Sequence, residues 1–165
     1  MIRLGIVSDS HGAHQWLERY LEKCRRERYD AVFHLGDLQL DARWLEKRLD
    51  VPLISVAGNC DVYSSAPRIA FADYEGRRIM AVHGHLQEVK YGFERLSYFG
   101  EQQNAQIVLF GHTHRQFAGF VGRTLLINPG ALQVGNCCEL LLEGERMVPR
   151  EMNLEDRNTK GGERT

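Results

Sequence analysis

The first half of the chain alternates short apolar runs with segments of helical spacing, and this alternation limits the fold more than any other feature of the sequence. The apolar runs cover residues 2–7, 31–35 and 52–57. Between them, residues 13–28 and 41–49 place their apolar side chains at helical intervals on one face. This β-α-β-α-β order predicts parallel strands with helices packed against the sheet.

The second half of the chain predicts a different arrangement. Residues 68–74 and 77–82 flank a Glu-Gly pair and have the pattern of a β-hairpin. A helix is expected over 92–104 and a buried strand over 107–110. Four further short strands, expected to be antiparallel, are joined by glycine-containing turns and cover 115–121, 124–128, 137–143 and 146–152. We therefore expect one two-sheet α/β domain over 1–152, followed by a polar, disordered tail over 153–165.

Size and charge limit the classes of partner. The chain has 165 residues, which suits one domain, and a net charge of −1. A protein so close to neutrality has no overall attraction for nucleic acid or for an anionic membrane. We therefore expect neither a membrane nor a stable nucleic-acid complex as partner, and an anionic substrate has to be held by a local positive centre.

The sequence also indicates the compartment. No apolar run approaches the ~20 residues that cross a bilayer, and the first nine residues are apolar too briefly for a signal peptide. The expected location is the cytoplasm. The chain has four cysteines, Cys24, Cys60, Cys137 and Cys138, and we expect them to be reduced thiols. The adjacent pair, Cys137 and Cys138, should point to opposite faces of one strand.

Five predicted strands end in side chains that can bind metal. The strand ends are Ser8-Asp9-Ser10-His11, Gly36-Asp37, Gly58-Asn59-Cys60-Asp61, His83-Gly84-His85 and Gly111-His112-Thr113-His114. Taken singly, Asp9, Asp37 and Asn59 fit a helix cap or a turn. Five coincidences at the edge of an α/β sheet where ligands bind are a poor explanation. By contrast, His14 on a helix surface and His34 inside a strand are expected to be structural.

This set of side chains favours a particular chemistry. Two carboxylates, one amide and four or five imidazoles suit borderline divalent metals such as Mn, Fe or Zn, whereas Ca and Mg prefer all-oxygen shells. The ligands are too many for one tetrahedral site. Two ions ~3.5–4 Å apart can clamp a phosphoryl group and lower the pKa of a shared water. The sequence therefore predicts hydrolysis of a phosphate ester at a binuclear metal centre.

In order and spacing these motifs resemble the calcineurin-like metallophosphoesterases, and the Gly-Asn-Cys-Asp variant is similar to their small YfcE-type phosphodiesterase branch. The resemblance implies an α/β/β/α sandwich of two mixed sheets and in-line attack on a phosphodiester by a metal-bridging hydroxide. It implies two divalent ions, with Mn expected and Ni, Co, Fe or Zn as variants. One ion would be held by Asp9, His11, Asp37 and His114, and the other by Asp37, Asn59, His83 and His112. Asp37 would be the bridge, and Asp37, Asn59 and His83 the catalytic residues of the centre.

One position departs from the wider family. Many relatives place a histidine after the asparagine, where it assists the leaving group, and this chain has Cys60 there. A thiol has an ordinary pKa near ~8.5 and donates hydrogen bonds weakly. The resemblance therefore favours diesters over monoesters. Cys60 is either a packing residue or a minor participant beside the metals, and His85 is an alternative source of a proton.

Three other functions compete with this one. A phosphomonoesterase of the same fold is disfavoured by Cys60, and a non-catalytic scaffold like the retromer subunit of the vacuolar-sorting type is disfavoured because every ligand position is filled. A nuclease would need a basic stripe, which this chain lacks. The expected substrate is a small phosphodiester or phosphorylated metabolite, with pocket walls from residues 60–68 and 85–93. The sequence leaves the oligomeric state open, a homo-oligomer included.

Overall fold

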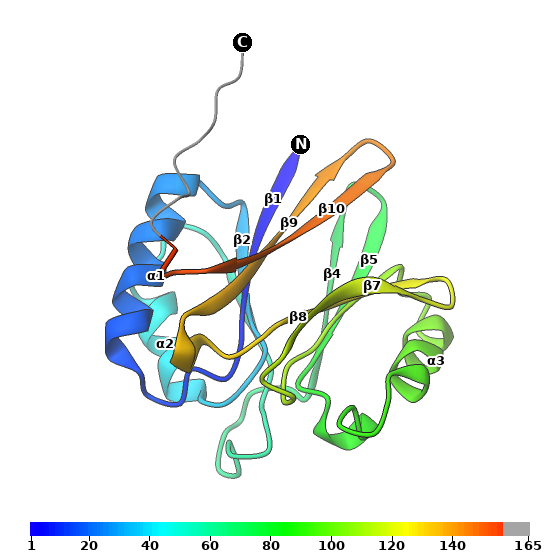
Figure 1. Ribbon diagram of the computed structural model, residues 1–165, viewed down its shortest axis with the longest axis horizontal. Helices are drawn as coiled ribbons and strands as arrows, with labels where there is room; N and C mark the ends of the chain where they lie inside the picture. Colours follow the sequence, from blue (N-terminus) through cyan, green and yellow to red (C-terminus); the bar gives the residue numbers. More distant parts are fainter. Residues whose placement is uncertain (157–165) are drawn as a thin grey trace.

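The computed structural model of the protein describes residues 1–156, and its first sheet carries the predicted β-α-β-α-β unit (Figure 1). The strands are β1 (Ile2–Val7), β2 (Ala31–His34), β3 (Leu53–Ser55), β9 (Asn136–Glu143) and β10 (Arg146–Asn153). Their order is β10-β9-β1-β2-β3. Strands β1, β2 and β3 are parallel, while β9 and β10 run antiparallel to their neighbours. The outer face of this sheet is covered by α1 (His14–Glu27) and α2 (Gln39–Glu46).

The second sheet is also mixed, and it packs against the first. Its strands are β4 (Ile69–Tyr74), β5 (Arg77–Val82), β6 (Ile107–Leu109), β7 (Gln116–Val121) and β8 (Thr124–Pro129), in the order β4-β5-β6-β8-β7. Strand β8 is antiparallel to β7, as predicted, but parallel to β6. The outer face is covered by α3 (Glu94–Gln102), and two short 3₁₀ helices, η1 (His85–Gln87) and η2 (Leu132–Val134), lie in the loops. The predicted α/β/β/α sandwich of two mixed sheets is confirmed.

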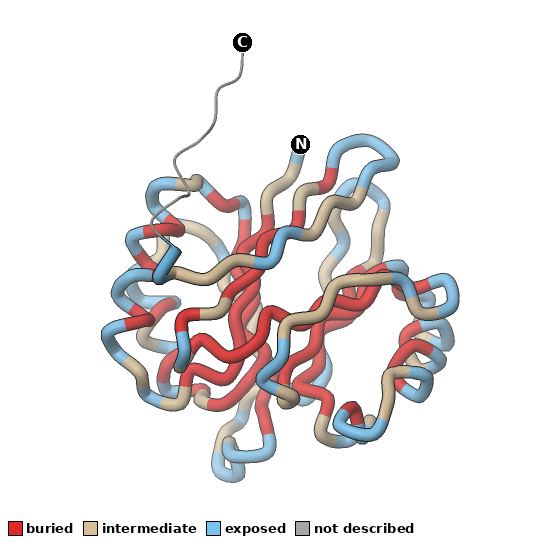
Figure 2. Tube along the Cα trace, viewed as in Figure 1, coloured by how far each residue is buried: buried red, intermediate tan, exposed pale blue. Residues whose placement is uncertain are grey.

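Alternation along the strands divides the apolar side chains between three layers of core. In β1 and β2, Ile6 and Phe33 face the layer between the two sheets, while Val7 and Val32 face the helices. The adjacent cysteines follow the same rule, since Cys137 packs under the helices and Cys138 packs between the sheets. Figure 2 shows buried residues concentrated along the central strands. Burying each such leucine, isoleucine or phenylalanine contributes roughly 1.5–3 kcal/mol to folding.

The predicted elements are all present, with ends that differ by a few residues. The last strand extends through Asn153, and the N–H of Leu154 donates to the carbonyl of Gly135 at 2.8 Å. Leu154 also packs against the core layer beneath α1. Asn153 and Leu154, which were predicted to belong to the tail, are therefore part of the folded domain, and residues 157–165 lie outside the described residues. No helix in the described part of the chain is long and apolar enough to cross a membrane.

Parallel pairing brings the predicted site to one edge of the molecule. The carboxyl ends of β1, β2 and β3 meet at the same edge of the first sheet, and β5 and β6 end beside them in the second. In Figure 1 the loops after these strands converge at the lower side of the sandwich. Each of the five predicted strand ends therefore contributes to one loop cluster.

Candidate metal centre

Two buried carboxylates form the floor of the loop cluster. Asp9 and Asp37 are 0% and 2% exposed. The Oδ2 atom of Asp9 accepts hydrogen bonds from Ser8 Oγ at 2.6 Å and from the N–H of His112 at 3.0 Å. The Oδ1 atom of Asp37 accepts from the N–H of Cys60 at 3.0 Å. Each carboxylate thus has one oxygen held by protein donors, and its second oxygen faces the histidines.

Three imidazoles approach the second oxygens of this floor. The Nε2 atom of His114 lies 3.2 Å from Asp9 Oδ1, and that of His11 lies 3.6 Å from the same oxygen. His11 Nε2 is also 3.9 Å from Asp37 Oδ2. His83 Nε2 lies 3.5 Å from Asp37 Oδ2 and 3.9 Å from Asp9 Oδ1. Asp9, His11 and His114 form one group whose ligand atoms lie close enough to share a metal ion, and Asp9, Asp37 and His83 form a second. A third group of this kind consists of His11, Asp37 and Cys60, so both aspartates belong to two groups.

The remaining predicted ligands complete the second group. Asn59 Oδ1 lies 3.0 Å from His83 Nε2 and 3.1 Å from His112 Nδ1, and the two ring nitrogens are 3.2 Å apart. The opposite nitrogen of His83, Nδ1, donates to the carbonyl of Leu35 at 2.7 Å. Because Nδ1 carries that hydrogen, the neutral ring presents a lone pair at Nε2. Lone pairs of His83, Asn59 and Asp37 therefore converge on one space, which is the arrangement that a cation satisfies.

Two glycines make room for the carboxylates. A side chain on Gly58 would place its Cβ 2.0 Å from Asp37 Oδ1, and one on Gly111 would place its Cβ 2.1 Å from Ser8 Oγ and 2.7 Å from Asp9 Oδ2. The two aspartates themselves are held in a left-handed backbone conformation, with φ of 52° at Asp9 and 51° at Asp37. This conformation is unfavourable for residues other than glycine, and such strain gathers at functional sites.

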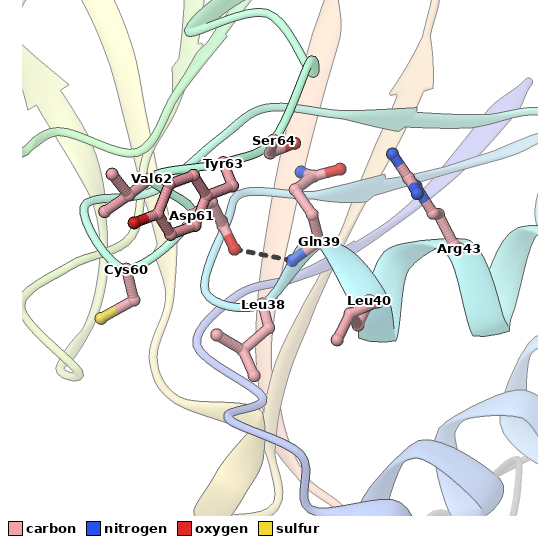
Figure 3. Close-up of a pocket in the computed structure, with 9 residues that line it drawn as sticks. All are labelled: Leu38, Gln39, Leu40, Arg43, Cys60, Asp61, Val62, Tyr63 and Ser64. Carbon is pink, nitrogen blue, oxygen red and sulfur yellow. Dashed lines mark hydrogen bonds between the residues drawn. The ribbon is translucent and has the colours of Figure 1, made fainter.

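Two supporting groups carry roles that the strand-end pattern does not predict. The first is Asp61, whose Oδ2 accepts from the N–H groups of Asp37 (3.0 Å) and Gly58 (2.8 Å), while its Oδ1 accepts from the N–H of Gln39 (2.9 Å; Figure 3). Asp61 therefore ties the loop after β3 to the loop before α2. The only sign of this role in the sequence is that Asp61 is the last residue of the Gly-Asn-Cys-Asp motif.

The second supporting group lies beneath the Asp9 loop. The hydroxyl of Ser10 donates to Asp41 Oδ2 at 2.6 Å and lies 2.9 Å from His34 Nε2, and the N–H of Gly12 donates to the same carboxylate oxygen at 2.8 Å. All three side chains are buried. His34 and His14 lie outside the candidate metal groups, as predicted, and His14 is exposed at the start of α1. A carboxylate on the inner face of α2 and a histidine within a strand were the available signals for this network.

The environment of the site sets the protonation of several groups. Burial lowers the pKa of His112 to about 4, and electrostatic interactions with His83 and Lys90 act in the same direction. Burial also lowers the pKa of His85, whose ring lies 5.5 Å from that of His83. Partial desolvation of the Cys60 thiol and its contact with Asp37 raise its pKa, so it is uncharged at neutral pH. Neutral imidazole is the form that binds metal.

The donor set fits divalent metal ions. Among the described residues, two buried atoms in the cluster, Asp9 Oδ1 and His11 Nε2, have no hydrogen-bond partner. Buried polar atoms are normally satisfied, and both of these atoms lie where predicted ligands meet. Carboxylate, amide and imidazole donors around one buried space define a class of protein, the divalent-metal-binding α/β proteins with an open site at the strand ends.

Comparison with known proteins identifies the family. The profile of the calcineurin-like phosphoesterase superfamily domain matches residues 2–137, and this chain belongs to that superfamily. A probable metallophosphoesterase of Bacillus subtilis, YsnB, is 31% identical over 129 residues, which cover 78% of this chain and 74% of the relative. The phosphodiesterase YfcE of Escherichia coli strain K12 is 26% identical, with 81% of each chain covered. The predicted resemblance is therefore confirmed.

Solved structures agree on the fold. A predicted phosphoesterase from Streptococcus pneumoniae superposes with a TM-score of 0.78 at 26% identity, over 93% of this chain and 90% of that one. A variant of Vps29 from Entamoeba histolytica superposes with a TM-score of 0.79 at 21% identity, over 94% of each chain. The likeness to Vps29 concerns the fold alone.

Three hollows lie along the loops that carry the predicted ligands. The first, of about 310 Å³, has a largely apolar lining that includes Leu38, Leu40 and Val62, together with Cys60, the residue that follows the predicted ligand Asn59 (Figure 3). The second, of about 190 Å³, is lined by Asn59, Asp61, Arg68 and His85 among others. The third, of about 480 Å³, lies between the segment after η1 and the loop after β6. Residues 60–68 and 85–93 do supply walls, as predicted, and the loop after β6 supplies a further one.

Proposed function

We propose that this protein is a phosphodiesterase that works with two divalent metal ions. The observation that carries the proposal is the set of converging lone pairs, in which Asp37 Oδ2 lies between His11 Nε2 at 3.9 Å and His83 Nε2 at 3.5 Å. One ion would be held by Asp9, His11, Asp37 and His114, and the other by Asp37, Asn59, His83 and His112. The superfamily and the YfcE relative support a hydrolase acting on phosphate esters.

The bridging role falls to Asp37 in this proposal. Its Oδ1 is occupied by the N–H of Cys60, so a single oxygen, Oδ2, faces both ligand groups. Asp9 Oδ1 also approaches three rings, those of His114, His11 and His83. An experiment can distinguish the two aspartates. Loss of a bridging ligand should weaken the binding of both ions, whereas loss of a terminal ligand should weaken the binding of one.

The protein's own groups would position and neutralise the substrate. The ions, when bound, supply positive charge for the phosphoryl oxygens and a water of lowered pKa. His83 is locked in one orientation by Leu35, and Asn59 is placed by the loop that Asp61 ties down. The mixed nitrogen and oxygen donors suit Mn, with Ni, Co, Fe or Zn as alternatives.

Cys60 and its surroundings support a preference for diesters. The thiol is exposed and uncharged, so it offers no second cation for a monoester dianion. It also borders the apolar hollow, which has room for an uncharged ester group. A small phosphodiester is therefore the substrate that the site favours over a phosphomonoester.

Metal content and substrate class test the proposal together. The protein, purified without chelator and reconstituted with Mn, should contain close to two ions per chain by elemental analysis. It should hydrolyse bis(4-nitrophenyl) phosphate faster than 4-nitrophenyl phosphate. His14→Ala, which changes an exposed histidine away from the centre, serves as the control and should retain both metal and activity. A maximum of one ion per chain, or no hydrolysis of any diester, would overturn the proposal.

A further inference from the structure

The third hollow beside the metal centre differs from the other two in charge. Its lining is Val89, Lys90, Phe93, Thr113, Arg115, Gln116 and Phe117, which includes two cations and no carboxylate. The lining of the apolar hollow contains one arginine, Arg43, and one carboxylate, Asp61. The lining of the small polar hollow contains Arg68 and the same carboxylate. Of the three, the hollow between Lys90 and Arg115 is therefore the one whose lining carries a net positive charge.

Nothing in the described part of the chain neutralises these two cations. Lys90 and Arg115 are exposed, and neither forms an ion pair with residues 1–156. Glu88, two residues before Lys90, is engaged by Arg95 in an ion pair of its own. The overall charge of the protein is −1, so a pair of free cations at one hollow is a local feature that the whole chain does not explain.

The loop that carries Arg115 is fixed next to the metal centre. Thr113, between the predicted ligands His112 and His114, accepts hydrogen bonds at its Oγ1 from Asn128 Nδ2 (3.0 Å) and from the N–H of Arg115 (3.2 Å). Arg115 therefore starts from a backbone that is tied to the same turn as the two histidines. On the other wall, Lys90 lines the same hollow, three residues before Phe93.

The hollow has an apolar base and a sizeable volume. Phe93 and Phe117 are partly exposed and pack with their ring centroids 4.7 Å apart. A volume of about 480 Å³ lies in the range of small-molecule sites. The apolar base of the hollow lowers the local dielectric constant, and this strengthens the attraction between the two cations and an anion bound in the hollow.

We propose that the hollow between Lys90 and Arg115 is a subsite for a second anionic group of the substrate, a phosphate carried on one of the two ester groups of the diester. The inference rests on the proposed phosphodiesterase function and narrows its substrate class to diesters that bear a further phosphate. Lysine and arginine side chains bind phosphate through charge-assisted hydrogen bonds, which are stronger than neutral ones. The phosphodiester at the metals and the second phosphate in the hollow would thus be bound by separate groups.

Matched substrates test the subsite. The two probes are thymidine 5′-(4-nitrophenyl phosphate) and the same compound with a 3′-phosphate, and they differ only in the second anionic group. Wild-type, Mn-loaded protein should show a kcat/KM about tenfold or more higher for the 3′-phosphorylated probe, mainly through KM. Lys90→Gln and Arg115→Gln should each lower that ratio several-fold, and the double variant should bring it close to one.

The controls separate a local subsite from a general field. Lys47→Gln removes one exposed positive charge at the end of α2 and should leave the ratio of the two probes unchanged. The subsite would be overturned if Lys47→Gln lowered the ratio of the two kcat/KM values as much as Lys90→Gln does. A ratio near one in the wild type would also overturn it. If no diester is hydrolysed, the proposed function fails separately. Titration of thymidine 3′,5′-bisphosphate into wild-type and doubly substituted Mn-loaded protein then decides the subsite, which is overturned by equal affinities.

Discussion

The floor and the rim of the candidate metal centre are held in different ways. We now count the buried ring of His83 with Asp9 and Asp37 as the floor, and the side chains of all three are at most 3% exposed. Each is fixed by a backbone group from a distant segment, such as the carbonyl of Leu35 for His83. The rim consists of His11, His114 and Cys60; the two histidine side chains are 26% and 42% exposed, and Cys60 is exposed as well.

This difference indicates separate tasks for the two regions. Charge and geometry reside in the floor, where burial keeps water from screening the carboxylates. The rim contacts solvent, and its side chains meet whatever approaches the centre. Substitutions in the floor should therefore affect metal binding and folding together, whereas substitutions in the rim should alter affinity or substrate choice while the fold is retained.

The largest expected effect is that of Asp37→Asn. This change removes a buried charge placed between the two ligand groups. The protein should therefore bind both ions more weakly, and its activity should fall by about 10³-fold or more. Asp9→Asn should weaken chiefly one ion, and His114→Ala, on the rim, should cost less activity than either. Elemental analysis and hydrolysis of bis(4-nitrophenyl) phosphate measure both effects. If His114→Ala were as damaging as Asp37→Asn, the distinction between floor and rim would be lost.

The next effect concerns stability beneath the floor, at His34. Burial lowers the pKa of His34 to about 4, whereas the unfolded side chain titrates near 6.5. Between these values the unfolded chain binds a proton that the folded chain does not, so stability rises with pH. The contribution is fully present above pH 6.5 and is lost as the pH falls toward 4, by roughly 3 kcal/mol in total.

Urea unfolding of the metal-free protein between pH 7 and 4 measures this dependence. Wild type should lose stability more steeply than His34→Gln, which keeps a polar group near Ser10 but cannot titrate. The difference between the two proteins isolates His34, because His112 titrates in both. Parallel pH profiles would show that His34 is not the group responsible.

The comparison of floor and rim also explains what the sequence alone could predict. Predicted ligands such as Asp9, Asp37 and His83 lie within three residues of the end of an apolar strand, and parallel strands deliver their carboxyl ends to a common edge. The fold class and the meeting of the seven predicted ligands were therefore accessible from order and spacing. Residues of the floor and of the rim could both be predicted from the ends of the strands, because the position of a residue along a strand can be read from the local sequence.

The supporting contacts were not accessible in the same way. Asp61 joins two loops through three backbone N–H groups, and the Ser10–Asp41–His34 network joins residues up to 31 positions apart. Such contacts depend on how segments pack, which periodicity does not encode. For the same reason the prediction that 124–128 is antiparallel held only against β7, since its pairing with β6 is set by the order of the sheet.

The smallest expected effect is a change of substrate preference at Cys60. A poor leaving group needs a proton as its bond to phosphorus breaks, and general acid help of that kind is worth ~10²–10⁴ in rate. The uncharged thiol supplies little of it, so wild type should favour aryl esters and diesters. Cys60→His would place an imidazole beside Asp37 and Asn59, where it can carry a positive charge for a monoester dianion.

Cys60→His should therefore raise monoester hydrolysis relative to diester hydrolysis by about tenfold, and it should flatten the dependence of rate on leaving-group pKa. Series of substituted phenyl phosphates and phenyl diesters measure both quantities. Cys60→Ser is the matched control, because a hydroxyl keeps the size of the thiol without adding a cation, and it should leave the ratio and the slope near their wild-type values. If Cys60→His left both unchanged with two ions still bound, position 60 would serve packing alone. The choice between diesters and monoesters would then have to be assigned to groups of the site other than Cys60.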